Sequence, residues 1–164
     1  STIEVMHEGE LDHHPFISRL GPDPIDRDAD ALEAHWQSGG FAGRALSGLL
    51  LDQAFAAGLG NYLRSEILFH ARIDPRRKLG DLAPSERRRL ARSTVTIVRR
   101  SLETGGATNA PSDVKRLKAA GHPRRVWRHY VFGQRSASCP RCGGSVRKDE
   151  LAGRRLYWCP ECQS

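Results

Sequence analysis

The sequence lacks any apolar run that approaches membrane-spanning length, and it has no charged-then-apolar leader at its start. These absences argue against an integral membrane protein and a signal peptide, so we expect a soluble cytoplasmic protein with no membrane partner. An initiating methionine is also absent, because the chain begins Ser1-Thr2. We therefore expect the sequence to be a fragment of a longer protein.

Cysteine is absent until residue 139, and the four cysteines then form two Cys-x-x-Cys pairs, Cys139 with Cys142 and Cys159 with Cys162. This clustering argues against a disulfide framework and favours a metal site in a reducing intracellular compartment. The sixteen residues between the pairs match the spacing of a four-thiolate zinc site, whose coordination shell is closed. The pattern predicts structural Zn²⁺ rather than a catalytic ion or a redox dithiol.

The segment between the two cysteine pairs has the pattern of a β-hairpin. Residues 146–148 and 156–158 are typical of strands, and residues 152–154 are typical of the turn between them. Arg154 and Arg155 then lie at the tip of a rigid hairpin, where guanidinium groups can bind phosphates with two parallel hydrogen bonds.

Acidic residues are scarce in the second half of the chain. Residues 1–75 carry five Lys and Arg against 12 Asp and Glu, a net charge of −7. Residues 76–164 carry 21 against seven, a net charge of +14. A strongly basic half is the electrostatic footprint of a polyanionic partner.

Two apolar helical runs that pivot on a glycine-rich turn organise the rest of the chain. Residues 44–55 are apolar on nearly every helical face, which predicts a buried core helix. Residues 62–68 predict a second helix, with Asn61 at its N-cap. Gly58 and Gly60 allow positive φ and leave no Cβ in front of that cap. Free N–H groups at such a helix start suit a phosphate, although most turns of this kind only join helices.

Two further helices follow from periodicity and punctuation. Residues 28–37 suit a short amphipathic helix. Pro84 opens a long helix that reaches Thr104, and the residues expected to point inward are Leu90, Ile97, Val98 and Leu102. The arginine-rich outer face of this helix is more often a solvated surface than a binding site. Residues 1–21 show little pattern beyond a short strand at 3–6.

The segment at residues 104–138 has little apolar content and is interpreted as a loop and linker. Its basic residues are interleaved with Trp127 and Tyr130, which fits contacts to a nucleic-acid backbone, although a tether that packs its aromatic residues on the core explains the pattern almost as well. The expected organisation is mainly α, in four segments: a remnant or linker at 1–21, a helical domain at 22–106, a basic linker at 107–135 and a zinc-finger β-hairpin at 136–164.

Two motifs are far more specific together than either is alone. The first is Leu-Asp-Gln…Gly-Leu-Gly-Asn-Tyr-Leu-Arg…Glu-Ile-Leu, which begins at Leu51, and the second is Arg-Arg-Leu-Tyr-Trp-Cys-Pro-Glu-Cys-Gln, which begins at Arg154. Together they resemble the formamidopyrimidine-DNA glycosylase/endonuclease VIII family, from about His14 to the last residue. Residues 50–55 and 157–160 look closer to the endonuclease VIII branch. The resemblance implies a helix-two-turns-helix domain followed by a zinc finger.

By this resemblance, Asn61 and neighbouring backbone amides such as that of Gly60 hold a phosphate beside a flipped-out damaged nucleotide, and Arg154 grips phosphates that flank the lesion. Both assignments agree with the physical interpretation of a helix N-terminus and a forked cation on a turn. The implied parent protein is a bifunctional DNA glycosylase/AP lyase of base excision repair, acting at the nucleoid on oxidised bases, with pyrimidines favoured. The implied partner is double-stranded DNA with a damaged base or an abasic site, and we expect a monomer.

Family members perform their chemistry with an N-terminal proline, which forms a Schiff base, and a following glutamate, both in an N-terminal β-sandwich domain. This sequence begins Ser1-Thr2, and Glu4 and Glu8 match nothing in the family motif. We therefore expect the C-terminal DNA-binding part of such an enzyme, with no catalytic residue and no activity by itself. The alternative is a stand-alone zinc-ribbon nucleic-acid-binding module without an enzymatic function.

Overall fold

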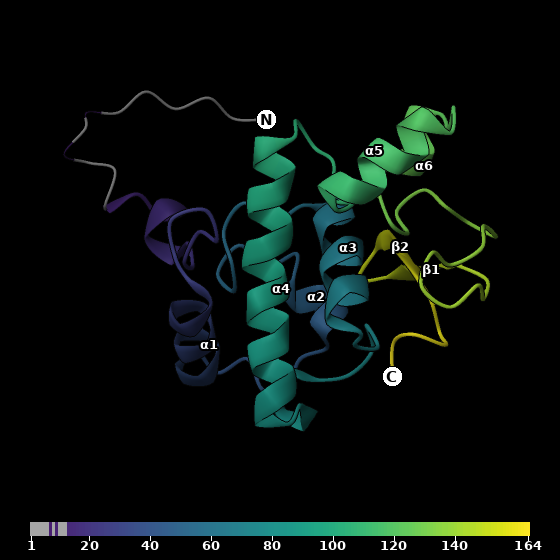
Figure 1. Ribbon diagram of the computed structural model, residues 1–164. Helices are drawn as coiled ribbons and strands as arrows, with labels where there is room; N and C mark the ends of the chain where they lie inside the picture. Colours follow the sequence, from purple (N-terminus) through teal and green to yellow (C-terminus); the bar gives the residue numbers. More distant parts are fainter. Residues whose placement is uncertain (1–6, 8, 10–12) are drawn as a thin grey trace.

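The computed structural model describes residues 7, 9 and 13–164, and over these residues the chain is mainly helical with one small β-hairpin (Figure 1). The expected fold class is confirmed for the described residues. The short strand expected at 3–6 lies outside them. In chain order the elements are η2 (Ile17–Arg19), α1 (Ala29–Ser38), α2 (Leu46–Leu49), α3 (Asn61–Ala71), η3 (Leu79–Asp81), α4 (Pro84–Glu103), α5 (Pro111–Ala119), α6 (Arg124–Arg128), β1 (Arg147–Leu151) and β2 (Arg154–Trp158).

The long helix α4 lies between α1 and α3 and contacts both (Figure 1). Pro84 occupies its first turn, and the Glu86 carboxylate accepts a hydrogen bond from the Ala83 N–H at 2.8 Å, so the expected helix start is confirmed. The expected inward residues Leu90, Ile97 and Val98 are buried. Leu102 is not, because 62% of it is exposed. The buried stripe of α4 ends at Ser101, and Leu102 lies about 100° further round the helix.

Helix α1 begins where the sequence predicts, because the Asp28 side chain accepts a hydrogen bond from the Ala31 N–H at 2.8 Å. Trp36 on its inner face stacks on Phe55, with ring centroids 4.4 Å apart. The indole N–H of Trp36 also donates to the Phe55 carbonyl at 2.9 Å. These contacts fix the loop between α2 and α3 against the helical core.

The core helix expected at residues 44–55 is wrong, because only Leu46–Leu49 form the helix α2 and turns follow it. Two polar side chains take over the backbone partners that a longer helix needs. Asp52 accepts from the Ala54 N–H at 2.9 Å, and Gln53 accepts from the Gly58 N–H at 2.9 Å and donates to the Leu59 carbonyl. The apolar residues of this stretch are nevertheless buried, so the expectation of a core segment holds.

The turn before α3 differs in detail from the expectation. Gly58 has the expected positive φ of 76°, but Gly60 is extended, with φ of −114°. Gly60 is the N-cap, and Asn61 is the first residue of the helix rather than its cap. A glycine N-cap has no side chain to bond the first N–H groups of α3, so these donors face outward.

The interpretation of residues 104–138 as a loop and linker is also wrong. The segment folds into α5 and α6, which pack against each other. Pro111 opens α5, and the buried Asn109 side chain donates to the Trp127 carbonyl at 2.9 Å and so joins the two ends of the segment. The boundaries of the four segments at 1–21, 22–106, 107–135 and 136–164 stay a prediction.

The β-hairpin forms as expected, with β1 and β2 antiparallel and Leu151 opposite Arg154. Ala152 and Gly153 form the turn, with φ of 53° and 67°. Positive φ at both central residues is the feature of a type I′ hairpin turn. Leu156 and Trp158 on β2 belong to the helical core, so the hairpin is packed on α3 rather than hanging free.

No helix among the described residues has both the length and the apolarity of a membrane span.

Candidate nucleic-acid interface and metal centre

The four cysteines converge although 23 residues separate the first from the last. Their sulfur atoms all lie within 4.8 Å of one another, with Cys139 Sγ 3.8 Å from Cys162 Sγ and Cys142 Sγ 3.6 Å from Cys159 Sγ. A tetrahedral ion with Zn–S bonds of about 2.3 Å separates its sulfur ligands by about 3.8 Å. These residues therefore fit a four-thiolate structural Zn²⁺, as the spacing predicts.

The metal centre is braced against the helical core by Gln163. This side chain is buried, accepts from the Cys159 N–H at 2.9 Å and donates to the Ile73 carbonyl at 3.0 Å. Arg141, in the loop between the first cysteine pair, donates to the Phe69 carbonyl at 2.9 Å. Zinc binding therefore positions the hairpin relative to α3, which is a structural role rather than a catalytic one.

Asn61 lies where the N-terminus of α3 meets the hairpin. Its amide nitrogen donates to the Arg155 carbonyl at 2.9 Å, and its amide oxygen accepts from Arg64 at 2.9 Å. Arg154 follows the Ala152-Gly153 turn, and its side chain is exposed. The structure thus brings together Gly60, Asn61 and Arg154, which the sequence separates by more than 90 residues.

Arg64 joins these parts, and the sequence reasoning missed it. The side chain is fully buried and donates to the carbonyls of Ser47 at 2.9 Å, Leu151 at 2.9 Å, Arg154 at 3.0 Å and Arg155 at 3.1 Å, as well as to Asn61. Burial, followed by the nearby Arg154 charge, lowers the pKa of Arg64 to about 10. The guanidinium stays charged at neutral pH and is held by neutral oxygen acceptors.

Glu66, two residues further along α3, is a second buried charge that sequence reasoning missed. Its carboxylate accepts from the Thr108 hydroxyl at 2.6 Å and from the backbone N–H groups of Tyr130, Val131 and Phe132 at 2.8–2.9 Å. Burial raises its pKa, while these four hydrogen bonds oppose the rise. Glu66 therefore holds the chain between α6 and the zinc finger against α3.

His129 extends this network, because its Nδ1 lies 3.1 Å from the Thr108 hydroxyl oxygen. The ring also contacts Tyr62 and Phe132, with centroids 5.2 and 5.7 Å away. Burial, with the charges of Arg128 and Arg124, lowers the pKa of His129 to about 4. The imidazole is therefore neutral at physiological pH. An isolated charged residue inside an apolar helical run is the one sequence signal that points to Arg64 and Glu66, and it gives no partner for either.

Comparisons with known proteins agree with this geometry. Residues 20–112 match the family model described as the formamidopyrimidine-DNA glycosylase H2TH domain, and residues 139–164 match the zinc finger found in FPG and IleRS. The chain is 41% identical over 165 residues to Endonuclease 8 of Klebsiella pneumoniae strain 342 and 39% identical to Endonuclease 8 of Salmonella arizonae. In both cases the alignment covers 99% of this chain and 59% of the relative.

Solved structures show the same fold. The MutM (Fpg) protein from Thermus thermophilus is 34% identical, with a TM-score of 0.74, over 94% of this chain and 57% of that one. The Lactococcus lactis Fpg in complex with a FAPY-dG-containing DNA gives a TM-score of 0.75 at 24% identity, over 96% of this chain and 56% of that one. The chain spans a little over half the length of these relatives. By its family-model matches and its curated relatives, it belongs to the formamidopyrimidine-DNA glycosylase/endonuclease VIII family and carries that family's helix-two-turns-helix domain and zinc finger.

Proposed function

We propose that this chain is the DNA-binding part of a bifunctional DNA glycosylase/AP lyase that acts on oxidised bases, with pyrimidines favoured. Its partner is double-stranded DNA with a damaged base or an abasic site. The curated relatives named Endonuclease 8 and the solved Fpg complexes with damaged DNA support this proposal. The catalytic proline and glutamate of the family belong to a domain that this chain does not include, so the chain alone binds DNA without excising a base.

One observation carries the proposal: Arg64 holds the two expected phosphate ligands together. Its Nη2 atom donates both to the Asn61 amide oxygen and to the Arg154 carbonyl. The uncapped N–H groups at the start of α3 and the exposed Arg154 guanidinium therefore lie on either side of one rigid junction. A helix N-terminus and a forked cation are the two features that bind phosphate most directly. We call Gly60, Asn61 and Arg154 the phosphate clamp.

The experiment that tests the proposal compares binding of a duplex with an abasic-site analogue by the parent chain and by Arg154→Ala, across a range of salt concentrations. Arg154→Ala is expected to weaken binding about tenfold and to lower the salt slope by about one, because one phosphate contact is lost. Arg147→Ala is the matched control, because Arg147 is exposed on the same hairpin but far from its tip. Equal binding by the parent and Arg154→Ala at every salt concentration contradicts the clamp.

A further inference from the structure

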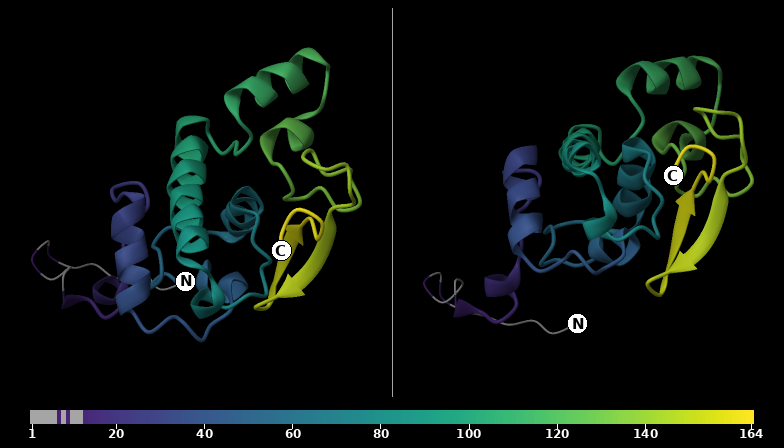
Figure 2. Two further views of the ribbon diagram at one scale, coloured as in Figure 1. Left: turned by 60° about the horizontal axis from the view of Figure 1, so that its bottom comes forward. Right: turned by 90° about the horizontal axis from the view of Figure 1, so that it is seen from below.

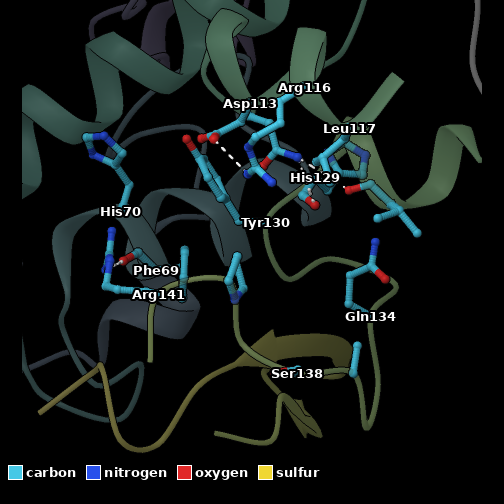
Figure 3. Close-up of a pocket in the computed structure, with 14 residues that line it drawn as sticks. Phe69, His70, Asp113, Arg116, Leu117, His129, Tyr130, Gln134, Ser138 and Arg141 are labelled. Carbon is cyan, nitrogen blue, oxygen red and sulfur yellow. Dashed lines mark hydrogen bonds and ion pairs between the residues drawn. The ribbon is translucent and has the colours of Figure 1, made fainter. Parts of the chain in front are cut away.

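Two grooves that the phosphate clamp does not use meet at His70, near the C-terminal end of α3. The first, of about 610 Å³, lies between α3, α5, α6 and the zinc-finger loop (Figure 3). The second, of about 460 Å³, runs along the first half of α4. His70 lines both, so the grooves form one continuous depression.

Arginines line this depression from three separate parts of the fold. Arg88, Arg89 and Arg92 come from α4, Arg141 comes from the zinc-finger loop and Arg116 comes from α5. We call these five arginines, with His70 between them, the basic band. Arg88 and Arg92 are one helical turn apart, about 6 Å along α4, so they form a row rather than a single cradle.

The positive charge of the basic band is poorly neutralised. Asp113 is the one acid among the residues that line the two grooves, and it already pairs with Arg116 at 3.0 Å. Glu86 lies 3.8 Å from Arg89 but pairs more closely with Arg77, at 2.6 Å. Within the described part of the chain, Arg88 and Arg92 have no ion pair at all.

The environment of His70 reports the same excess of positive charge. Burial lowers its pKa, and Arg100, Arg141 and Arg72 lower it further because each repels a proton on the ring. The Nδ1 atom of His70 lies 2.9 Å from the Ser93 hydroxyl, so the ring is also fixed in place. An anion in the depression relieves this repulsion, whereas a cation or a neutral ligand does not.

The basic band lies away from the phosphate clamp. Asn61 begins α3 and His70 is nine residues further on, about 14 Å along the helix axis. Both views in Figure 2 place the α5–α6 pair and the turn of the β1–β2 hairpin at opposite edges of the molecule. A duplex held at Asn61 and Arg154 therefore approaches a different face from one held at Arg88 and Arg92.

We propose that the basic band is a second nucleic-acid-binding surface, which takes the sugar–phosphate backbone of a DNA segment other than the one in the phosphate clamp. The inference rests on the proposed function, because it assigns a second DNA site to a DNA-binding chain. A row of arginines along an open groove suits a chain of phosphates, whereas a small anion needs convergent donors. Two surfaces let the protein pass directly from one DNA segment to another before it fully dissociates.

The test measures how fast a labelled abasic-analogue duplex leaves the protein as the concentration of unlabelled duplex rises. Direct transfer makes the dissociation rate of the parent rise with competitor concentration. In Arg88→Glu/Arg92→Glu the rate is expected to lose about fivefold of this dependence while the rate extrapolated to zero competitor is unchanged. Arg19→Glu/Arg27→Glu is the charge-matched control, because both arginines are exposed in the acidic half of the chain. Thermal unfolding confirms that each variant is folded, and Arg88→Gln/Arg92→Gln provides a milder change.

A dissociation rate that is independent of competitor in the parent, or equally dependent in the band variants, overturns the inference and leaves the phosphate clamp intact. An equal loss in the Arg19/Arg27 control also overturns it, because net charge then explains the effect. Retained competitor dependence in Arg154→Ala, with weaker binding, separates the two surfaces. A parent that binds no duplex contradicts the proposed function itself.

Discussion

At the residue scale, two buried charges on α3 organise the interface. Arg64 reaches toward the hairpin tip, and Glu66 reaches toward the chain between α6 and the zinc finger. Neither pairs with an opposite charge: Arg64 is held by neutral oxygen acceptors, and Glu66 by a hydroxyl and three amides. The cost of burying each charge is offset only when every one of these hydrogen bonds is made. These two residues therefore specify how the surrounding segments dock on α3.

Replacing Arg64 tests this role. Arg64→Met keeps the volume roughly but leaves four carbonyls and the Asn61 amide oxygen without their donor, so it is expected to destabilise the fold by about 3–5 kcal/mol. Urea unfolding measures this change. Arg64→Lys keeps the charge but not the forked geometry, and an intermediate loss is expected. Arg147→Met, at an exposed site, is the control. A stability of Arg64→Met within about 0.5 kcal/mol of the parent contradicts the bracing role.

His129 gives the fold a defined acid sensitivity. Its pKa is about 4 in the folded chain and about 6.5 in the unfolded chain, so folding favours the neutral ring. The contribution to stability is fully present above pH 6.5 and is lost as the pH falls toward 4, by about 2 kcal/mol. Unfolding free energies measured across this range are expected to fall less steeply in His129→Gln than in the parent. His122→Gln, at an exposed site, is expected to keep the parental slope, and identical slopes for the parent and His129→Gln contradict the account.

At the scale of elements, the sequence predicts those whose stability is local. Asp28 as a cap and Pro84 in a first turn mark α1 and α4, and the 3.6-residue period does the rest. The stretch after α2 defeats the periodic pattern because Asp52 and Gln53 bond the backbone themselves. Helices α5 and α6 are short and carry few apolar residues, so their packing on each other and the buried Asn109 explain them better than propensity does.

The zinc-bound hairpin is the element whose loss has the widest effect. Cys159→Ser is expected to release zinc and to remove hydrogen-exchange protection from the β1 and β2 amides, because the thiolates hold both ends of the finger. Loss of the hairpin also uncovers the core side of Leu156 and Trp158, so the melting temperature falls. Ser145→Ala is the control in the same loop. Full zinc content in Cys159→Ser, measured by metal analysis, contradicts the four-thiolate site.

At the scale of the whole molecule, charge and function are separated between surfaces. The clamp lies where α3 meets the hairpin, and the basic band lies near the other end of α3. The sequence indicates that the second half of the chain is basic, and it indicates Asn61 and Arg154 as candidate ligands. Periodicity and composition give no sign that Arg64 joins these two, because its partners are backbone carbonyls distributed over Ser47, Leu151, Arg154 and Arg155.

The most direct test of the central claim is a double-mutant cycle on the clamp, in which Asn61→Ala and Arg154→Ala are made singly and together and the affinity for an abasic-analogue duplex is measured. Each single change is expected to weaken binding about tenfold. The double variant is expected to lose less than the product of the two, because both residues act through one junction on Arg64. Single variants that bind as tightly as the parent, or fully independent losses, contradict a single phosphate clamp at the start of α3.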